Sequence, residues 1–453
     1  MNDKFKKKYT NPKYPNIKLY SNMLLSELQL NKFIEKNKEV KLINTSKDNI
    51  ILEPILKKYL DNKINNKLFK ISNRDNILED TFKYIYYNTL TGIYIKILNN
   101  KVKIFYLFYN EDYKNDWIDN IKIPNFYRNL NRKYINNDKS KWSVNNCIID
   151  NRTITNEAKE SMEFNRLLEF KYFLKLVCKK YKIKDIDFFI NRRDFPIIRN
   201  DNKHPYTHVY DTIKKYNTSS FIPVFSQSTS SEYADIPFVN VDDITLLTNI
   251  TFPPKNNKIT IPTIVDWKNK SNVAFFRGTA TGCGVVAETN QRIKLATISY
   301  KLNNKNILDA GLVSWNRRDK LWNKKMTLIN PKRLGFPLVE KVSPQEQQKY
   351  KYLIHVDGHV SAYRLTRELY SGSVILLVKS PNNYSLWITP LLKEWIHYVP
   401  VKADLSDLID KIKWCQSNDS KCKIIADNAL KLAKEYVTLD NALKYTAYIL
   451  NNI

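Results

Sequence analysis

The sequence predicts an α/β protein, because segments with helical periodicity alternate with short apolar runs typical of buried strands. Residues 157–181 carry apolar side chains near helical spacing and are followed by the apolar run 186–190. The alternation returns at residues 350–378 as a strand, a turn, a helix and a second strand. A chain of 453 residues has room for two large domains or three smaller ones.

The first part of the chain contributes a polar segment and then a hairpin. Residues 1–75 are rich in Lys and Asn, and we interpret them as an N-terminal extension of unknown role. Residues 92–110 alternate apolar and polar side chains on both sides of Asn99 and Asn100, which predicts a two-stranded hairpin.

The apolar run 186–190 ends in a charged cluster, "NRRDFP", that contains Asp194. Open α/β sheets bind ligands outside the carboxyl ends of their strands, which makes this cluster a candidate site. A carboxylate flanked by Arg192 and Arg193 is expected to be ionised and could accept a proton from a hydroxyl group. A turn or ion-pair role is the plainer alternative for this Asp.

The segment 226–237, "SQSTSSEYADIP", is rich in hydroxyl groups and contains two carboxylates. Such a segment can bind sugar hydroxyls, or it can be an ordinary loop. Its candidate contacts to an acceptor or a sugar are Ser230, Glu232, Tyr233 and Asp235.

The polar segment 254–271 is interpreted as an interdomain linker. Alternating strands and helices resume after it. We expect strands at 273–278, 351–356 and 373–378, and helices at 361–370, at 404–415 and over the last thirty residues.

Composition limits the partners and the compartment. The formal charge of +29 would attract nucleic acid, an anionic membrane or a phosphorylated small molecule. Lys, Asn and Ile also recur throughout, as in a chain from an AT-rich viral or parasite genome, which is an equally simple source of the charge.

Five cysteines, an odd and small number for this length, argue against a disulfide framework. Without a secretory h-region or an apolar run of membrane length, we expect a cytoplasmic protein with no membrane span.

The segment 274–296 gathers Gly278, Gly282 and Gly284 after a predicted strand. It lacks the Lys-Ser/Thr of a Walker A loop, and no acid follows at the spacing of a dinucleotide-binding fold. A flexible loop without a ligand remains an alternative.

No motif predicts a metal site. His204 and His208 are four residues apart, but a proline lies between them and the segment lacks the helix that such a pair would need. The need for a divalent metal stays open.

The segment 350–376 predicts a strand, a turn at Asp357 and Gly358, and a helix whose amino end at 359–361 would favour an anion. Arg364 would lie one turn into this helix, where its guanidinium could bind a phosphate. A solvated basic helix face is the alternative interpretation of Arg364 and Arg367.

Together, four ordered blocks resemble glycosyltransferase family 90, the protein O-glucosyltransferase and capsule-associated glycosyltransferase family. The blocks are "FFINRRDFP" (188–196), "PVFSQSTSSEYADIP" (223–237), "AFFRGTATG" through "NQR" (274–292), and 350–376 continuing to 395–408. Their order, spacing and uncommon strings agree, and the resemblance covers roughly residues 85–450. It does not extend to the first 75 residues.

The resemblance implies roles for individual residues. Asp194 matches the catalytic base of the family's R-D-[YF]-P string, Thr279 matches a nucleotide-sugar contact, and Arg292 matches the residue that grips the diphosphate. The loop that precedes Arg292 is longer than in the animal protein O-glucosyltransferases. The strip expected to line the nucleotide pocket is His359, Val360, Ser361, Ala362, Tyr363 and Arg364, with Arg277, Gly278, Asp357 and Gly358 in support.

The family further implies two Rossmann-like domains facing a cleft, in a GT-B-like α/β architecture, with an acceptor-side domain at 76–262 and a nucleotide-sugar-binding domain at 263–453. We expect inverting transfer of a sugar, glucose or xylose, from a UDP-sugar donor to a hydroxyl of a protein or glycan acceptor. UDP-sugar is then a substrate, and no cofactor is required. A basic nucleic-acid-binding protein that keeps the fold without the chemistry is the alternative.

Overall fold

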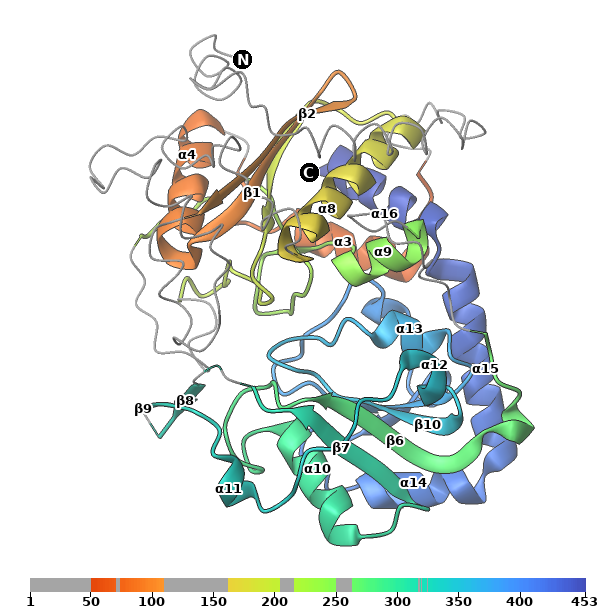
Figure 1. Ribbon diagram of the computed structural model, residues 1–453. Coiled ribbons are helices and arrows are strands. Elements are labelled where there is room, and N and C mark those ends of the chain that lie inside the picture. The colour runs from red at the N-terminus through yellow and green to blue at the C-terminus, as the bar shows by residue number, and fades with distance from the viewer. Residues whose placement is uncertain are drawn as a thin grey trace.

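The computed structural model describes residues 50–70, 74–109, 162–203, 216–249, 263–316, 318, 320–323 and 325–453. Two five-stranded sheets organise this part of the chain (Figure 1). The α/β class predicted from the sequence is confirmed.

The first sheet has the strand order β2-β1-β3-β4-β5. Its strands are β1 (Thr91–Leu98), β2 (Lys101–Tyr109), β3 (Ile186–Asn191), β4 (Val224–Ser226) and β5 (Ile236–Pro237). β1 is antiparallel to both β2 and β3, whereas β3, β4 and β5 are parallel. The predicted hairpin is confirmed: Asn99 and Asn100 form its turn with φ of 50° and 59°, the left-handed geometry that such two-residue turns require.

The second sheet is entirely parallel, with the strand order β12-β11-β10-β6-β7. Its strands are β6 (Ser271–Thr279), β7 (Leu308–Ser314), β10 (Tyr350–His355), β11 (Val374–Val378) and β12 (Val399–Val401). The chain runs outward from β6 to β7 and then returns to add β10 on the other side of β6. Ligands of parallel sheets bind outside the carboxyl ends at such a reversal. A short hairpin follows β7, made of β8 (Lys320–Trp322) and β9 (Lys325–Thr327).

Helices cover both sheets, and the C-terminal ones connect the two halves. α15 (Asp419–Tyr436) runs alongside the second sheet, and α16 (Leu439–Asn452) lies beside α8 (Met162–Lys180) and the first sheet (Figure 1). The first half also contains a π-helical turn at Ile85–Thr89, and the second has 3-10 turns at Trp267–Asn269 and Thr389–Leu391. The helices are α3 (Pro54–Ile64), α4 (Arg74–Tyr84), α8 (Met162–Lys180), α9 (Val241–Thr248), α10 (Gln291–Leu302), α11 (Pro331–Leu334), α12 (Pro344–Gln347), α13 (Leu365–Leu369), α14 (Leu408–Ser417), α15 (Asp419–Tyr436) and α16 (Leu439–Asn452).

Part of the predicted N-terminal extension belongs to the folded core. Leu56 and Leu60 of α3 are buried in the same apolar cluster as Phe173 of α8 and Tyr445 of α16. Burial of about 1.5–3 kcal/mol per large apolar side chain ties this helix to the first sheet. Residues 1–49 lie outside the described part of the chain.

Two predicted helices begin later than the sequence pattern indicates. The helix expected from residue 361 begins at Leu365, and the one expected from Asp404 begins at Leu408. Asp404 instead accepts a hydrogen bond from the backbone N–H of Ser406, 3.0 Å away, and so forms a turn.

Among the described helices, none combines the length and the apolar character that a membrane crossing needs.

Candidate functional site

Asp194 lies in the turn that follows β3, and its side chain is exposed. The two arginines that precede it point elsewhere: Arg192 donates to the hydroxyl of Thr91 at 2.9 Å, and Arg193 donates to the carbonyl of Thr89 at 2.7 Å. The structure gives the carboxylate of Asp194 no ion pair or hydrogen bond within the described residues. It is therefore free to accept a proton from a bound molecule.

Asn191, the last residue of β3, makes side-chain hydrogen bonds to both sides of this turn. Its side-chain nitrogen donates to the carbonyl of Phe195 at 2.7 Å, and its side-chain oxygen accepts from the N–H of Arg193 at 2.8 Å. The same nitrogen lies 3.0 Å from the hydroxyl oxygen of Ser226. Asn191 is fully buried, so these bonds hold both sides of the turn that carries Asp194.

Asp235 holds the next part of the same turn. Its two carboxylate oxygens accept the backbone N–H groups of Ile197 and Ile198 at 2.8 and 2.7 Å, and the hydroxyl of Ser226 also donates to it. The sequence suggested Asp235 as an acceptor contact. Its side chain is 0% exposed, so it cannot meet an acceptor at the surface and instead positions the chain after Asp194.

Lys63 of α3 is hydrogen-bonded to the hydroxyl-rich segment 226–237 and holds it in place. Its ammonium donates to the carbonyls of Ser230 and Tyr233 at 2.7 and 2.5 Å and to the hydroxyl of Thr229 at 3.1 Å. Ser230 and Tyr233 are themselves buried, whereas Glu232 is exposed and pairs with Arg199 at 3.2 Å. Sequence reasoning missed Lys63, because no local signal marks a lysine as buried.

On the other side of the site, residues 280–290, here called the glycine loop, connect β6 to α10. Gly282 and Gly284 have φ of 129° and 107°, which L side chains rarely adopt. A Cβ at Gly284 would lie 2.6 Å from the carbonyl oxygen of Thr289. Asn290 then caps α10 by accepting the N–H groups of Arg292 and Ile293, both at 3.1 Å. The loop therefore ends in a helix that the sequence analysis did not predict.

Three predicted residues lie at the carboxyl end of β6. The hydroxyl of Thr279 is 2.8 Å from that of Ser314, which links β6 to the end of β7. Arg277 makes a two-bond ion pair with Asp309, at 2.9 Å to each oxygen, so its guanidinium supports the sheet. Gly278 lacks a side chain where a Cβ would lie 2.8 Å from the ring of Phe276.

Arg292 sits where the strand order reverses, between the ends of β6 and β10. Its guanidinium donates to the carbonyls of Thr279, Val356 and Asp357 at 3.1, 3.1 and 2.9 Å. A fourth bond reaches the hydroxyl of Thr281 at 2.6 Å. Burial, with Arg364 nearby, lowers the pKa of Arg292 to about 9. Arg292, the predicted diphosphate contact, thus directs four of its N–H donors at oxygen atoms of the protein.

The turn after β10 is a loop rather than a helix end. The N–H of Gly358 donates to the carbonyl of Val360 at 2.9 Å, and the N–H of Ala362 donates to the side chain of Asp357 at 3.2 Å. Burial raises the pKa of Asp357 and lowers that of His359 well below its usual value. Because α13 begins only at Leu365, residues 359–361 lie in the turn before the helix and are not its amino end. Anion binding by this turn stays a prediction.

Ser361, Tyr363 and Arg364 complete this strip. The hydroxyl of Ser361 lies 2.9 Å from that of Ser228, across the two halves of the chain. Tyr363 is half-buried and packs against the apolar core. Arg364 donates one nitrogen to the carbonyl of Arg277 at 2.9 Å, and its Nε lies 3.1 Å from the carboxylate of Glu368, so its charge is paired. Its other terminal nitrogen, Nη2, is buried and has no hydrogen bond within the described residues.

The turn after β3 and the glycine loop after β6 meet at one apolar cluster. Phe195, next to Asp194, packs in a small apolar cluster with Val360 and with Cys283 of the glycine loop. Tyr233 and Tyr384 complete the cluster. A pocket opens beside it, lined by the glycine loop, the start of α10, the 357–359 turn and the segment 380–384. The structure therefore brings Phe195, which follows the predicted base, close to the glycine loop and to Val360 of the strip 357–364.

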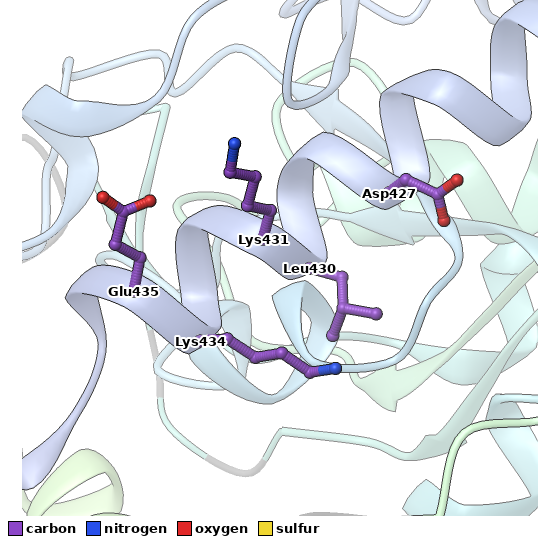
Figure 2. Close-up of a pocket in the computed structure, with 5 residues that line it drawn as sticks. All are labelled: Asp427, Leu430, Lys431, Lys434 and Glu435. Carbon is purple, nitrogen blue, oxygen red and sulfur yellow. The ribbon is translucent and has the colours of Figure 1, made fainter.

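Figure 2 shows another hollow, about 440 Å³ in volume, on the surface of α15, lined by Asp427, Leu430, Lys431, Lys434 and Glu435. All of its lining comes from one helix, and none of the predicted site residues contributes. Within the described residues, no group of three or more His, Cys, Asp or Glu is placed to hold a metal ion. His204 and His208 lie outside these residues.

Several known proteins are similar to this chain. It is 35% identical over 433 residues to uncharacterized protein 179R of Invertebrate iridescent virus 6, covering 81% of this chain and 36% of that protein. It is 29% identical over 294 residues to protein O-glucosyltransferase 3 of Mus musculus, covering 62% of this chain and 50% of that protein. The chain thus spans about a third to a half of the length of these relatives.

The crystal structure of Anabaena Alr3699/HepE in complex with UDP is 11% identical over 41% of this chain and 50% of that chain, with a TM-score of 0.26, too low to carry an argument. The viral relatives are consistent with the compositional bias, and no comparison supports the nucleic-acid-binding alternative. The family described as Glycosyl transferase family 90 matches residues 122–453. This chain belongs to glycosyl transferase family 90.

Proposed function

We propose that this chain transfers a sugar from a UDP-sugar donor to a hydroxyl group of a protein or glycan acceptor, with inversion at the sugar carbon. Membership in the family and the names of the O-glucosyltransferase relatives support the reaction class. Glucose and xylose are the proposed sugars. The GT-B-like division into an acceptor-side domain at 76–262 and a donor-side domain at 263–453 is part of the proposal.

The observation that carries the proposal is the position of Asp194. Its carboxylate is exposed and has no partner among the described residues, and it lies in a turn whose next residue, Phe195, packs against the apolar cluster that contains Val360 of the opposite half. A base at the carboxyl end of one sheet faces loops at the carboxyl end of the other. Donor and acceptor groups must meet at this kind of junction for transfer to occur.

In the proposed reaction, Asp194 removes the proton of the acceptor hydroxyl as its oxygen attacks the sugar's anomeric carbon. The bond from that carbon to the diphosphate breaks, and its electron pair stays on the leaving phosphate oxygen. Cationic side chains near the glycine loop, Arg364 among them, stabilise the negative charge that develops there. Thr279 is proposed to contact the donor.

The test is Asp194→Asn, assayed for release of UDP from UDP-glucose and UDP-xylose. Loss of the base should slow turnover by about a hundredfold to ten-thousandfold, while affinity for UDP stays the same. Asp201→Asn is the matched control, because Asp201 is an exposed carboxylate on the same segment that pairs with Arg199. Near-normal turnover by a folded Asp194→Asn variant would refute the assignment of Asp194 as the base.

A further inference from the structure

The two arginines that precede Asp194 tie its turn to an earlier part of the chain. The guanidinium of Arg192 donates to the hydroxyl of Thr91 at 2.9 Å, and that of Arg193 donates to the carbonyl of Thr89 at 2.7 Å. Both acceptor residues are buried. Hydrogen bonds from a charged donor are stronger than those between neutral groups, so these two contacts hold the start of the turn firmly.

Tyr84, the last residue of α4, holds the other end of the same turn. Its hydroxyl donates to the carbonyl of Ile197 at 2.6 Å. Its ring is buried and packs edge to face on Phe221, with the ring centroids 4.9 Å apart. A ring fixed by such packing keeps its hydroxyl directed at this carbonyl.

All three contacts come from one continuous stretch, residues 84–91. It contains the end of α4, the π-helical turn Ile85–Thr89 and the start of β1. β1 pairs with β3, and Gly92 lies opposite Asn191, so the stretch lies beside the turn that follows β3. π-helical turns are rare overall and frequent at functional sites.

Asp194 depends on this turn for its position. Its carboxylate is exposed and has no hydrogen bond or ion pair within the described residues, so the backbone of the turn places it. Asn191 and Asp235 hold that backbone from within the family-matched residues 122–453, whereas residues 84–91 hold it from outside the match. A base must lie within about 3 Å of the proton it removes, so a small shift of the turn would slow the reaction.

We propose that Tyr84, Thr89 and Thr91 are positioning residues for the base Asp194, so that the chain before the family-matched region completes the active site. The inference rests on the proposed function. Tyr84 and Thr91 act through their side chains, and Thr89 acts through its carbonyl. All three are buried, so they act through the turn and do not meet the substrate.

UDP release from UDP-glucose and UDP-xylose by the full chain tests the proposal. Thr91→Val and Tyr84→Phe each remove one hydroxyl group and keep the shape of the side chain. Each should lower kcat by about tenfold because the base is displaced, and should leave KM for the donor unchanged because the donor-side loops are untouched. Thr91→Ser keeps the hydroxyl and should retain the kcat of the wild type.

Tyr94→Phe is the matched control. The hydroxyl of Tyr94, on β1, donates to Asp187 at 3.0 Å near the opposite end of β3. The substitution should lower the midpoint of thermal unfolding about as much as Tyr84→Phe does and should leave kcat unchanged. An equal loss of kcat in this control would overturn the proposal, because it would tie the rate to stability alone.

A double-mutant cycle separates positioning from general damage. Added to Asp194→Asn, the substitutions Thr91→Val and Tyr84→Phe should lower kcat no further, because the base that they position is absent. An independent loss in that background would overturn the proposal. Unchanged kcat in a folded single variant would overturn the role of the residue replaced.

If one of the two variants does not fold, the other decides by the same outcomes. A wild-type chain that releases no UDP, or an Asp194→Asn variant with near-normal turnover, would overturn the proposed function itself. Single variants with wild-type kcat beside a slow Asp194→Asn variant would overturn this inference alone. The two failures are therefore distinguishable.

Discussion

Lys320→Met should make the unliganded protein more stable. Lys320 is fully buried and, within the described residues, makes one long hydrogen bond, and Met fills a similar volume without a charge. Replacing a buried ion with a well-packed apolar side chain is often stabilising.

The magnitude follows from the pKa of Lys320. Burial lowers this pKa from 10.5 to about 8. The difference of about 2.5, at 1.36 kcal/mol per pKa unit, corresponds to about 3 kcal/mol of lost stability at pH 7. Between pH 8 and pH 10.5 the folded state releases this proton before the unfolded state does, so the cost falls to about 1 kcal/mol at pH 10.

Urea unfolding of the wild type, Lys320→Met and the exposed control Lys325→Met at pH 7 and pH 10 measures this effect. The Lys320 variant should exceed the wild type by about 3 kcal/mol at pH 7 and by about 1 kcal/mol at pH 10. The control should differ from the wild type by less than about 0.5 kcal/mol at either pH. A Lys320→Met variant less stable than the wild type at pH 7 would refute the reasoning, because it would mean that the protein satisfies this ammonium.

Three substitutions near the site should lower stability. Asp235→Asn should cost about 2–4 kcal/mol in urea unfolding, because an amide cannot accept both backbone N–H groups; a cost under about 1 kcal/mol would count against the positioning role. Lys63→Met should cost about 1–3 kcal/mol and reduce turnover, since two loop carbonyls lose their donor; unchanged stability would contradict this. Gly284→Ala should cost more than about 2 kcal/mol by thermal unfolding, because its φ is 107° and its Cβ would meet Thr289, whereas Gly335→Ala, with open space around it, should cost less.

Much of the fold was predictable because local patterns determine it. Alternating side chains around Asn99 and Asn100 predicted the β1–β2 hairpin, and these two residues adopt the left-handed turn. The apolar run before Asp194 predicted a buried strand, and β3 is buried along its whole length. Where one short segment contains all the information, the sequence pattern was sufficient.

Predictions failed where a side chain's partner lies far along the chain. Residues 361–364 suit a helix, yet Ser361 bonds to Ser228 and Arg364 to the carbonyl of Arg277, which holds them outside α13. The buried positions of Lys63 and Lys320 likewise depend on contacts with distant loops. One available signal was overlooked: Asn290, directly before a segment with good helix formers, is a typical N-cap and marked the start of α10.

The contrast between Arg292 and Lys320 follows from the shapes of their charged groups. A planar guanidinium presents five donors in a fixed fork, which suits it to joining the carbonyls at the ends of β6 and β10. An ammonium has three donors and no fixed fork, and within the described residues Lys320 uses one of them, on a bond of 3.5 Å. The residue with fixed geometry therefore fits the role of holding the strand ends. The buried and poorly bonded ammonium is a cost to folding, which is why its replacement by Met is expected to stabilise the protein.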